Sequence, residues 1–343
     1  MANNRSTRSA PSAAPAPQAV TAGNYTTLQF LIANNNTADL QIPSDFIMTS
    51  PLVINGNNDI TIKSQSGIRK LIRSPALGGD AIVIHPGGKL TLINIEINGN
   101  ESAVTAVPGA LIAMSGATSV LNLQSGATVT RNRNDISNGG LIRADGGTIN
   151  MTGSSFVSYG SAENGGGIAL SQTAYLNEGP QASIIYNTAS NNGGGVSGIA
   201  WYGQMHIAGT VANNTADKNG GGIYVPKSSL DQVYVESTAS FSANSAKSPV
   251  VLRKPSDEAL YQSHIAGTTW TAYNQGYNNL DIAYNRLASS VSSSRRMMFF
   301  HGHSNPVLLC DRPHNAPVDL ACGCSTDQDG GVCCNISHPT CPT

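Results

Sequence analysis

The chain has 343 residues, of which 40% are hydrophobic and only 11% are charged, and its formal net charge is −1. A nearly neutral chain lacks the basic surface that binds nucleic acid or an anionic membrane, so neither is expected as a partner. No stretch approaches the roughly 18 consecutive apolar residues of a membrane-spanning helix. The low charge instead favours an all-β body with a surface of Ser, Thr, Asn and Gly.

The first two segments are predicted to lead into the fold. Residues 1–27 are polar and rich in Ala, Ser and Pro, and they lack the apolar stretch of a secretory signal. We therefore expect a flexible leader with no recognisable signal peptide. Residues 28–78 are expected to form an N-terminal cap and the first coils. Thr27–Asn34 is the best helix candidate in the chain, and a helix there would cover the open edge of the first coil.

Six glycine-opened segments recur through residues 79–252, at intervals of 26 to 30 residues. Each glycine is followed by a short, mostly apolar run. A period of this length is typical of a solenoid, in which each repeat buries its apolar face against its neighbours. A seventh, degenerate copy is expected at residues 248–253. The six opening glycines are Gly79, Gly109, Gly139, Gly165, Gly193 and Gly220.

Short alternating runs of β-forming residues, separated by Gly and Asn, predict three strands in each repeat. This pattern describes a parallel β-helix, in which one repeat makes one coil and coils stack at the strand spacing of roughly 4.8 Å. Inward Ile, Val and Leu would then form ladders from coil to coil. The glycines are expected to supply corners with positive φ, a conformation that β-branched residues adopt only at a cost.

An asparagine follows the last strand in five of the six repeats. Stacked coils would align these side chains into a ladder of amides that bond from coil to coil. The Gly139 copy interrupts the ladder, with Gly160 near that point. The expected ladder residues are Asn100, Asn132, Asn187, Asn213 and Asn244.

The repeat that pairs Gly220-Gly-Gly-Ile with Phe241-Ser-Ala-Asn244 resembles the repeat of polymorphic outer-membrane-protein adhesins. It is also similar to the wider right-handed parallel β-helix superfamily. The resemblance covers residues 79–252 and implies right-handed coils. It implies no single function, because that superfamily includes adhesins, phage tailspikes and pectin-degrading enzymes. The Phe-x-x-Asn motif occurs once in this chain, which is a departure from the adhesin pattern.

The C-terminal part is predicted to contain a cap, a linker and a tail. Residues 253–288 concentrate Tyr and Trp, which we interpret as the core of a C-terminal cap rather than as a platform for sugars. Residues 289–343 are expected to form a linker and an irregular Cys-rich tail. The cysteines of the tail are Cys310, Cys322, Cys324, Cys333, Cys334 and Cys341.

An even set of six cysteines in a short tail predicts disulfides or intermolecular cross-links, whose connectivity the sequence leaves open because six cysteines allow 15 pairings. Zinc is the alternative. His301, His303, His314 and His338 lie among the cysteines, but their spacings fit no zinc-finger pattern. We therefore predict cross-linking, with no metal and no cofactor.

Carboxylates could make the solenoid an enzyme, because neighbouring coils can present an acid and a base together. Asp80 and Asp145 lie near glycine corners two coils apart, about 10 Å by the stacking distance, near the upper limit for an inverting glycosidase. We expect turn roles instead, because no two candidates share one offset on consecutive coils. Pectinase motifs are missing from the sequence, so we predict no enzyme. The candidates are Asp80, Asp135, Asp145, Glu163, Asp217 and Asp231.

Together these features predict a non-catalytic structural or adhesive β-helix at the surface of a cell, spore or particle. The Cys-rich tail would anchor it or cross-link it to copies of itself or to other coat proteins. The alternative is a β-helix that binds or cleaves carbohydrate, similar to tailspikes or pectinases, with a glycan as partner.

Overall fold

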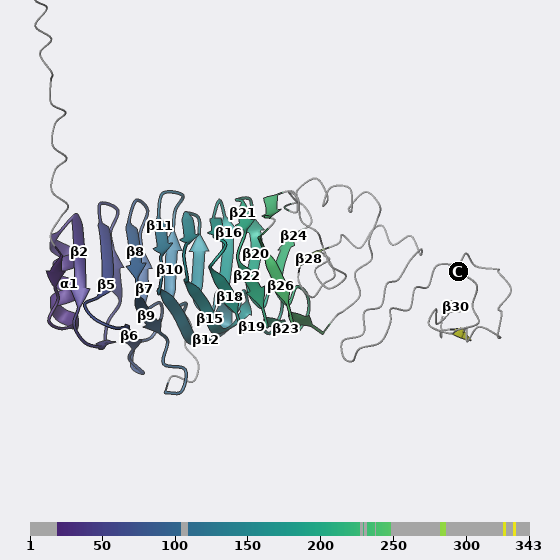
Figure 1. Cartoon of the computed structure of the whole chain (residues 1–343), viewed down its shortest axis with the longest axis horizontal. Helices are drawn as coiled ribbons and strands as arrows, with labels where there is room; N and C mark the ends of the chain where they lie inside the picture. Colours follow the sequence, from purple (N-terminus) through teal and green to yellow (C-terminus); the bar gives the residue numbers. More distant parts are fainter. Residues whose placement is uncertain are drawn as a thin grey trace, which may run out of the picture.

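The computed structural model (Figure 1) describes residues 19–103, 109–226, 229, 232–236 and 238–247, together with three short strands further along the chain. Up to residue 247 the described chain forms an elongated stack of parallel strands (Figure 1), with α1 (Tyr25–Asn34) at one end. The three later strands are β28 (Ile282–Asn285), β29 (Ser325–Thr326) and β30 (Val332–Cys333).

Three sheets run along the stack, and we number them in the order in which the chain visits them. Sheet 1 contains, in spatial order, β1 (Val20–Thr21), β2 (Thr37–Ile42), β5 (Asp59–Ser64), β8 (Lys89–Ile93), β11 (Val120–Leu123), β14 (Thr148–Met151), β17 (Tyr175–Glu178), β21 (Met205–Ile207) and β25 (Val233–Val235). Sheet 2 contains β3 (Phe46–Met48), β6 (Arg69–Arg73), β9 (Ile95–Asn98), β12 (Thr128–Asn138), β15 (Phe156–Asn164), β18 (Ser183–Ile185), β22 (Thr210–Ala212) and β26 (Ser240–Ser242).

The second half of β15 continues sheet 2 through a row of three very short strands, β19 (Thr188–Ala189), β23 (Thr215–Ala216) and β27 (Ser245–Ala246). Sheet 3 contains β4 (Leu52–Ile54), β7 (Ile82–Ile84), β10 (Ile112–Ser115), β13 (Ile142–Asp145), β16 (Ile168–Gln172), β20 (Val196–Trp201), β24 (Ile223–Pro226) and β28.

From β2 onward the chain visits sheets 1, 2 and 3 in turn and then returns to sheet 1 one strand further along. Neighbouring strands pair in parallel, as β8 pairs with β11 and β10 with β13. The solenoid makes about seven turns of the right-handed type, the hand that parallel crossover connections take. The predicted fold class, an all-β right-handed parallel β-helix, is confirmed.

The core is a set of apolar ladders inside the stack. In sheet 1 the strand register aligns Leu90 with Leu121, and Leu121 with Ile149. All three side chains have no exposed surface. Each such Leu or Ile contributes about 1.5–3 kcal/mol relative to an exposed side chain. Because consecutive coils are one strand spacing apart, aligned apolar side chains contact each other from coil to coil along the stack.

Helix α1 covers the first coil, as expected for the segment Thr27–Asn34, although it begins at Tyr25. The side chain of Asn24 accepts a hydrogen bond from the Thr27 amide at 2.8 Å, which caps the helix N-terminus. Leu28 and Ile32 lie on the buried face of the helix, which packs on β2, β3 and β4. No helix in the described residues has the length and hydrophobicity to cross a membrane.

The segment 1–27, expected to be a flexible leader, contributes to the first coil where the structure describes it. Strand β1 pairs in parallel with β2, through Val20 opposite Leu40. Tyr25 is the first residue of α1 and its hydroxyl donates to the Ser50 carbonyl at 2.7 Å. The last residues of this segment are therefore part of the cap.

The strand beyond β24 in sheet 3 is not the seventh glycine copy. That copy was expected at residues 248–253, which lie outside the described residues, but the position beside β24 is occupied by β28, with Ile282 opposite Ile223. The seventh copy itself therefore stays a prediction, and β28 supplies the strand beside β24. This strand comes from the segment 253–288.

Residues with positive φ turn the chain at two kinds of corner. Five repeat-opening glycines have φ between 64° and 75°, so their predicted corner role is confirmed at Gly79, Gly139, Gly165, Gly193 and Gly220. The exception is Gly109, where a Cβ would lie 2.3 Å from the Gly79 carbonyl carbon, so the need is for close approach. A second corner lies at the bend of sheet 2 and was not predicted. There, non-glycine residues take φ between 51° and 60°, namely Asn100, Arg131, Tyr159, Tyr186, Asn213 and Ala243.

Candidate functional site

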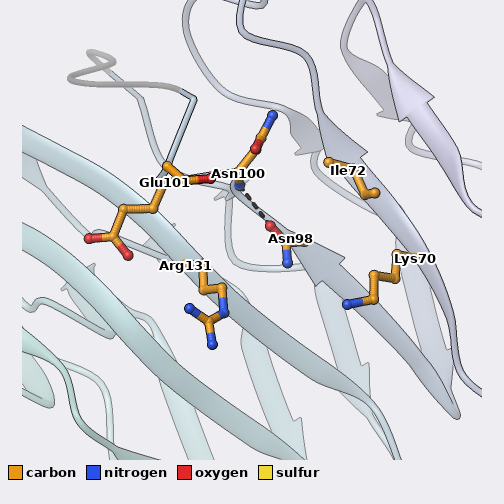
Figure 2. Close-up of a pocket in the computed structure, with 7 residues that line it drawn as sticks. Lys70, Ile72, Asn98, Asn100, Glu101 and Arg131 are labelled. Carbon is orange, nitrogen blue, oxygen red and sulfur yellow. Dashed lines mark hydrogen bonds between the residues drawn. The ribbon is translucent and has the colours of Figure 1, made fainter.

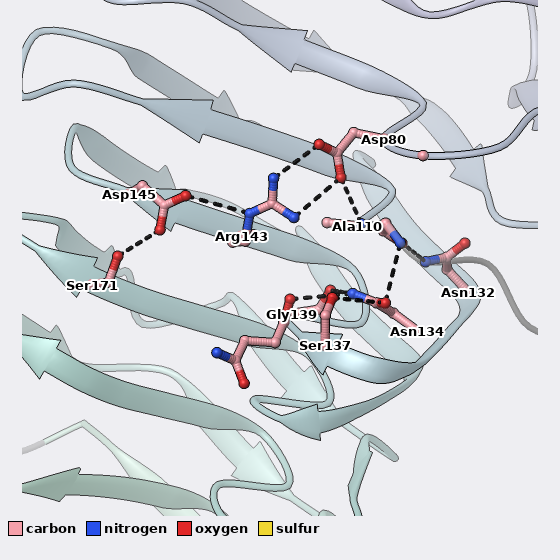
Figure 3. A network of polar contacts seen from close by, with 12 residues as sticks. Asp80, Ala110, Asn132, Asn134, Ser137, Gly139, Arg143, Asp145 and Ser171 are labelled. Carbon is pink, nitrogen blue, oxygen red and sulfur yellow. Dashed lines mark hydrogen bonds and ion pairs between the residues drawn. The ribbon is translucent and has the colours of Figure 1, made fainter.

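Two of the candidate carboxylates meet at one arginine on the outer face of sheet 3 (Figure 3). The Arg143 guanidinium reaches Asp80 with Nη2–Oδ2 at 2.9 Å and Nη1–Oδ1 at 3.3 Å. Its Nε lies 3.4 Å from Oδ2 of Asp145, two residues along β13. The two carboxylates therefore share one cation, which the sequence did not reveal.

The reach from Arg143 to Asp80 crosses a whole strand. Asp80 precedes β7, and β10 lies between β7 and β13. The residue of β10 beside Arg143 is Ala113, whose small side chain leaves room for the guanidinium. Asp80 Oδ1 also accepts from the Ala110 amide at 2.8 Å, and Asp145 Oδ1 accepts from Ser171 Oγ at 2.5 Å. The network thus links strands of four successive coils.

Three further candidates lie on the second half of sheet 2. Asp135 Oδ2 accepts from Arg133 at 2.6 Å, a hydrogen bond that raises the pKa of the guanidinium, and its Oδ1 accepts from Ser161 Oγ at 2.9 Å. Glu163 Oε1 accepts from Asn191 at 2.7 Å. Asp217 pairs with Lys247 at 2.8 Å. Asp231 lies outside the described residues.

The expectation that no two candidates share an offset on consecutive coils stays a prediction, and the strand register bears most closely on one pair. Asp135 and Glu163 both follow the register pair Asn134–Ala162, on the adjacent strands β12 and β15. The register shifts between Asn134 and Asn138, a stretch that includes Asp135, and the pairing resumes with Asn138 opposite Asn164.

Catalysis by an acid–base pair requires one carboxyl that keeps its proton and another that is free to accept one. Each of the five described candidates instead accepts a hydrogen bond or an ion pair, and most of these cross from one coil to the next. Such an arrangement is suited to holding coils in register. Exposed ion pairs of this kind contribute at most about 1 kcal/mol each.

The predicted asparagine ladder lies inside the bend of sheet 2. Asn187 Nδ2 donates to Asn214 Oδ1 at 3.0 Å, and Asn214 Nδ2 donates to Asn244 Oδ1 at 3.1 Å. In the coil that precedes Asn187, Gly160 occupies the ladder position. Its backbone N–H donates to Asn187 Oδ1 at 2.9 Å. A Cβ at Gly160 would lie 2.1 Å from the Gly166 carbonyl oxygen, so no Asn fits there.

The spacing predicted Asn213 as the ladder residue of its coil. In the structure the ladder residue is Asn214. Asn213 takes the left-handed conformation, with φ of 55°, and turns the chain so that the next side chain points inward. Asn100 likewise occupies the left-handed position, and its side chain donates to the Arg73 carbonyl at 3.1 Å. The prediction failed because two consecutive asparagines, or one in a different coil geometry, satisfy the same sequence pattern.

Asn132 lies at the ladder position in β12 but bonds to an arginine. Arg73 is fully buried, and its Nη1 donates to Asn132 Oδ1 at 3.0 Å. Its other guanidinium nitrogens donate to the carbonyls of Leu77 and Gly79. Burial lowers the pKa of Arg73, while the nearby Asp80 charge raises it. Arg73 therefore occupies the place that an amide fills in later coils.

A second asparagine ladder precedes the glycine corners. Asn164 donates to Asn138 at 2.9 Å, Asn192 to Asn164 at 3.2 Å, and Asn219 to Asn192 at 2.9 Å. The signal in the sequence is simple, because each of these residues stands directly before a Gly-Gly pair. A third column runs along the outer face of sheet 1, where Asn177 donates to Asn150 and Asn150 to Asn122.

A cleft of about 350 Å³ opens on the outer face of sheet 2 near the N-terminal end (Figure 2). Charged and amide side chains surround it. Lys70 pairs with Glu96 on the neighbouring strand at 3.1 Å, and Asn98 Oδ1 accepts from the Asn100 amide at 2.8 Å. The lining residues are Lys70, Ile72, Asn98, Asn100, Glu101, Ser102 and Arg131.

Arg131 connects this cleft to two exposed tyrosines. Its guanidinium carbon lies 5.1 Å from the centre of the Tyr159 ring, a cation–π contact. Tyr159 stacks on Tyr186 with ring centres 5.2 Å apart and an angle of 6° between the rings. The two rings are 45% and 46% exposed. Their left-handed backbone places these three residues in one row across three coils, which the sequence did not predict.

The cysteines and histidines of the tail lie almost entirely outside the described residues. Cys333 is in β30, which pairs antiparallel with β29. Cys310, Cys322, Cys324, Cys334 and Cys341 are outside. Among the residues that the structure describes, no three His, Cys, Asp or Glu side chains cluster as metal ligands would. The prediction of cross-linking therefore stays a prediction.

The geometry defines the class of this protein as a parallel β-solenoid with polar ladders along its corners and faces. Comparisons with protein-family models, with curated proteins and with solved structures find no match for the chain. The assignment of this fold therefore depends on the strand order, register and hydrogen bonds of the chain itself.

Proposed function

We propose that this chain is a non-catalytic, rigid β-helical element of a cell, spore or particle surface, where it serves a structural or adhesive role. The observation that carries the proposal is the use of polar side chains. Candidate carboxylates and asparagines alike bond from coil to coil. Polar side chains that bond neighbouring coils to each other make the solenoid rigid, and such a use favours a structural role over a catalytic one.

The predicted tail supplies the means of attachment. Its six cysteines would join the rod to copies of itself or to other coat proteins through disulfides. The test is electrophoresis of the full chain from its native assembly, with and without reductant. We expect multimers that collapse to monomer on reduction, and that disappear when all six cysteines are changed to serine. A monomeric, fully thiol-reactive chain in the assembly would contradict this attachment.

A second candidate function, glycan binding, is favoured by the cleft beside the tyrosine row. Amides and charged groups at Asn98, Asn100 and Glu101 offer both hydrogen-bond donors and acceptors to sugar hydroxyls. The exposed Tyr159 and Tyr186 edges extend the same strip across the coils. A neutral or weakly charged oligosaccharide that lies along this strip is the expected ligand.

Glycan-array binding followed by titration calorimetry tests this candidate. We expect Asn98→Ala and Arg131→Ala to weaken binding about tenfold or more, the loss of one or two hydrogen bonds to the ligand. The matched control is Asn150→Ala, which removes an amide from the outer face of sheet 1. Equal effects of all three changes would exclude the cleft. Release of reducing ends would show cleavage instead of binding.

A further inference from the structure

One carboxyl group faces the inside of the solenoid. Glu178 is the last residue of β17 and lies in register between Met151 on β14 and Ile207 on β21. It is 2% exposed. Both of its carboxyl oxygens are buried and make no hydrogen bond of good geometry among the described residues, although the Gly209 amide lies close enough to favour the charged form in part. A charged carboxylate without a partner is costly in such a place.

The fold provides space for this side chain by means of a glycine. Gly209 precedes β22 at the corner between sheets 1 and 2, where a Cβ would lie 2.4 Å from the Ala182 carbonyl oxygen, 2.6 Å from the Gly179 carbonyl oxygen and 3.0 Å from the Glu178 carboxyl carbon. The residues that precede the equivalent strands β12, β15, β18 and β26 carry a side chain, and they are Ala127, Ser155, Ala182 and Ala239. The missing Cβ at Gly209 therefore allows both the close backbone approach at this corner and the inward position of the Glu178 carboxyl.

Among the described residues that pack against Glu178 from its neighbouring strands and corner, none carries a charge that would compensate its ionised form. The side chains that face it from β14 and β21 are Met151 and Ile207, and the corner adds Ala182 and Gly209. The titratable groups on these strands point outward. They are Tyr175 on β17, which is 39% exposed, and His206 on β21, which is 41% exposed and lies 3.6 Å from Glu236.

We propose that Glu178 is a proton switch within the solenoid, whose uncharged form holds the coils of β17, β21 and β25 together and whose ionisation loosens them. This device is separate from the proposed surface role and from the glycan cleft. It stabilises the C-terminal coils more in an acidic than in an alkaline medium.

The direction of the effect follows from proton binding in the two states. Burial raises the pKa of Glu178 to about 8, and the Gly209 amide opposes this in part. In the unfolded chain a Glu titrates near its ordinary pKa of about 4.3. Between these values the folded form keeps a proton that the unfolded form has lost. The stability that Glu178 contributes is therefore fully present below about pH 4.3, declines up to about pH 8 and is lost above it.

Thermal unfolding of the full chain at pH 5 and pH 9 tests the switch. For the natural chain we expect the midpoint to fall by about 5–10 °C over this range. Glu178→Gln cannot ionise, so this part of the decline should vanish. The matched control is Glu96→Gln, on the outer face of sheet 2, which should leave the decline unchanged. A decline that persists in full in Glu178→Gln would overturn the proposal.

Hydrogen exchange of the natural chain gives a second measurement that needs no variant, should Glu178→Gln fail to fold. After correction for the intrinsic base-catalysed rate, protection in β17, β21 and β25 should drop at least tenfold from pH 6 to pH 9, with little change in β5, β8 and β11. Equal protection changes in both sets of strands would refute a local switch at Glu178.

Discussion

In the N-terminal coils, β2 to β9, the side chains that join neighbouring strands are mostly charged, whereas in the C-terminal coils, β15 to β27, they are mostly amides. Lys63 pairs with Asp39 at 2.7 Å and Lys89 with Asp59 at 3.0 Å, both on sheet 1. In the later coils the buried Asn187 and Asn214 take over the same task in sheet 2. The backbone geometry is similar in both regions.

The difference shows how strongly each chemistry constrains the sequence. A lysine reaches its partner from several rotamers and through flexible methylenes, so an ion pair tolerates small changes in register. An amide ladder requires the same offset in each coil, because every side chain both donates and accepts. The regular Gly and Asn pattern of the later repeats is the consequence, and the irregular start of the chain reflects its absence there.

Breaking the amide ladder should have the largest effect. Asn214→Ala removes the acceptor for two Asn187 donors and the donors to Ile184 and Asn244. Because these groups are buried, we expect a loss of about 3–5 kcal/mol in the free energy of unfolding, measured in urea. The matched control is Asn213→Gly, which suits the left-handed backbone and should cost less than about 0.5 kcal/mol. The reverse order would mean that Asn213 is the ladder residue after all.

The buried arginine is the corresponding point in the N-terminal coils. Arg73→Met keeps much of the buried volume but leaves Asn132 Oδ1 and the carbonyls of Leu77 and Gly79 without a donor. We expect a loss of about 2–4 kcal/mol in the free energy of unfolding. Arg133→Met, at an exposed arginine paired with Asp135, serves as the control and should cost less than about 1 kcal/mol. A small effect of Arg73→Met would show that water replaces the guanidinium.

Much of the fold could be predicted from the sequence, because repeated glycines and alternating β-formers report directly on period and strand length. The N-terminal helix could be predicted from the segment Thr27–Asn34, whereas the Asn24 cap and the start at Tyr25 came from the structure. The eighth strand of sheet 3 could not. Ile282–Asn285 joins β24 after a long stretch of sequence, and no periodic signal spans that distance.

The polar sites were harder to predict. A left-handed residue shifts the inward position by one, which moved the ladder from Asn213 to Asn214, and the same corner placed Arg131, Tyr159 and Tyr186 in a row. Glu178 gave no signal, because a Glu at the end of a strand reads as exposed. Its burial depends on Gly209 in the next coil, a contact between residues that the sequence separates.

The smallest expected effect concerns salt, and it distinguishes the two regions without a change in the core. Lys89→Ala removes a pair whose side chains are 42% and 48% exposed, so its loss should cost at most about 1 kcal/mol. Raising the ionic strength to 1 M reduces the Debye length to about 3 Å, and should erase most of that difference between natural chain and variant. The cost of Asn214→Ala should hardly change, because a buried amide ladder is not screened. Urea titrations of both variants at low and high salt give the four values. If high salt reduced the costs of Lys89→Ala and Asn214→Ala to the same degree, the proposed difference between charged contacts in the N-terminal coils and amide contacts in the C-terminal coils would be contradicted.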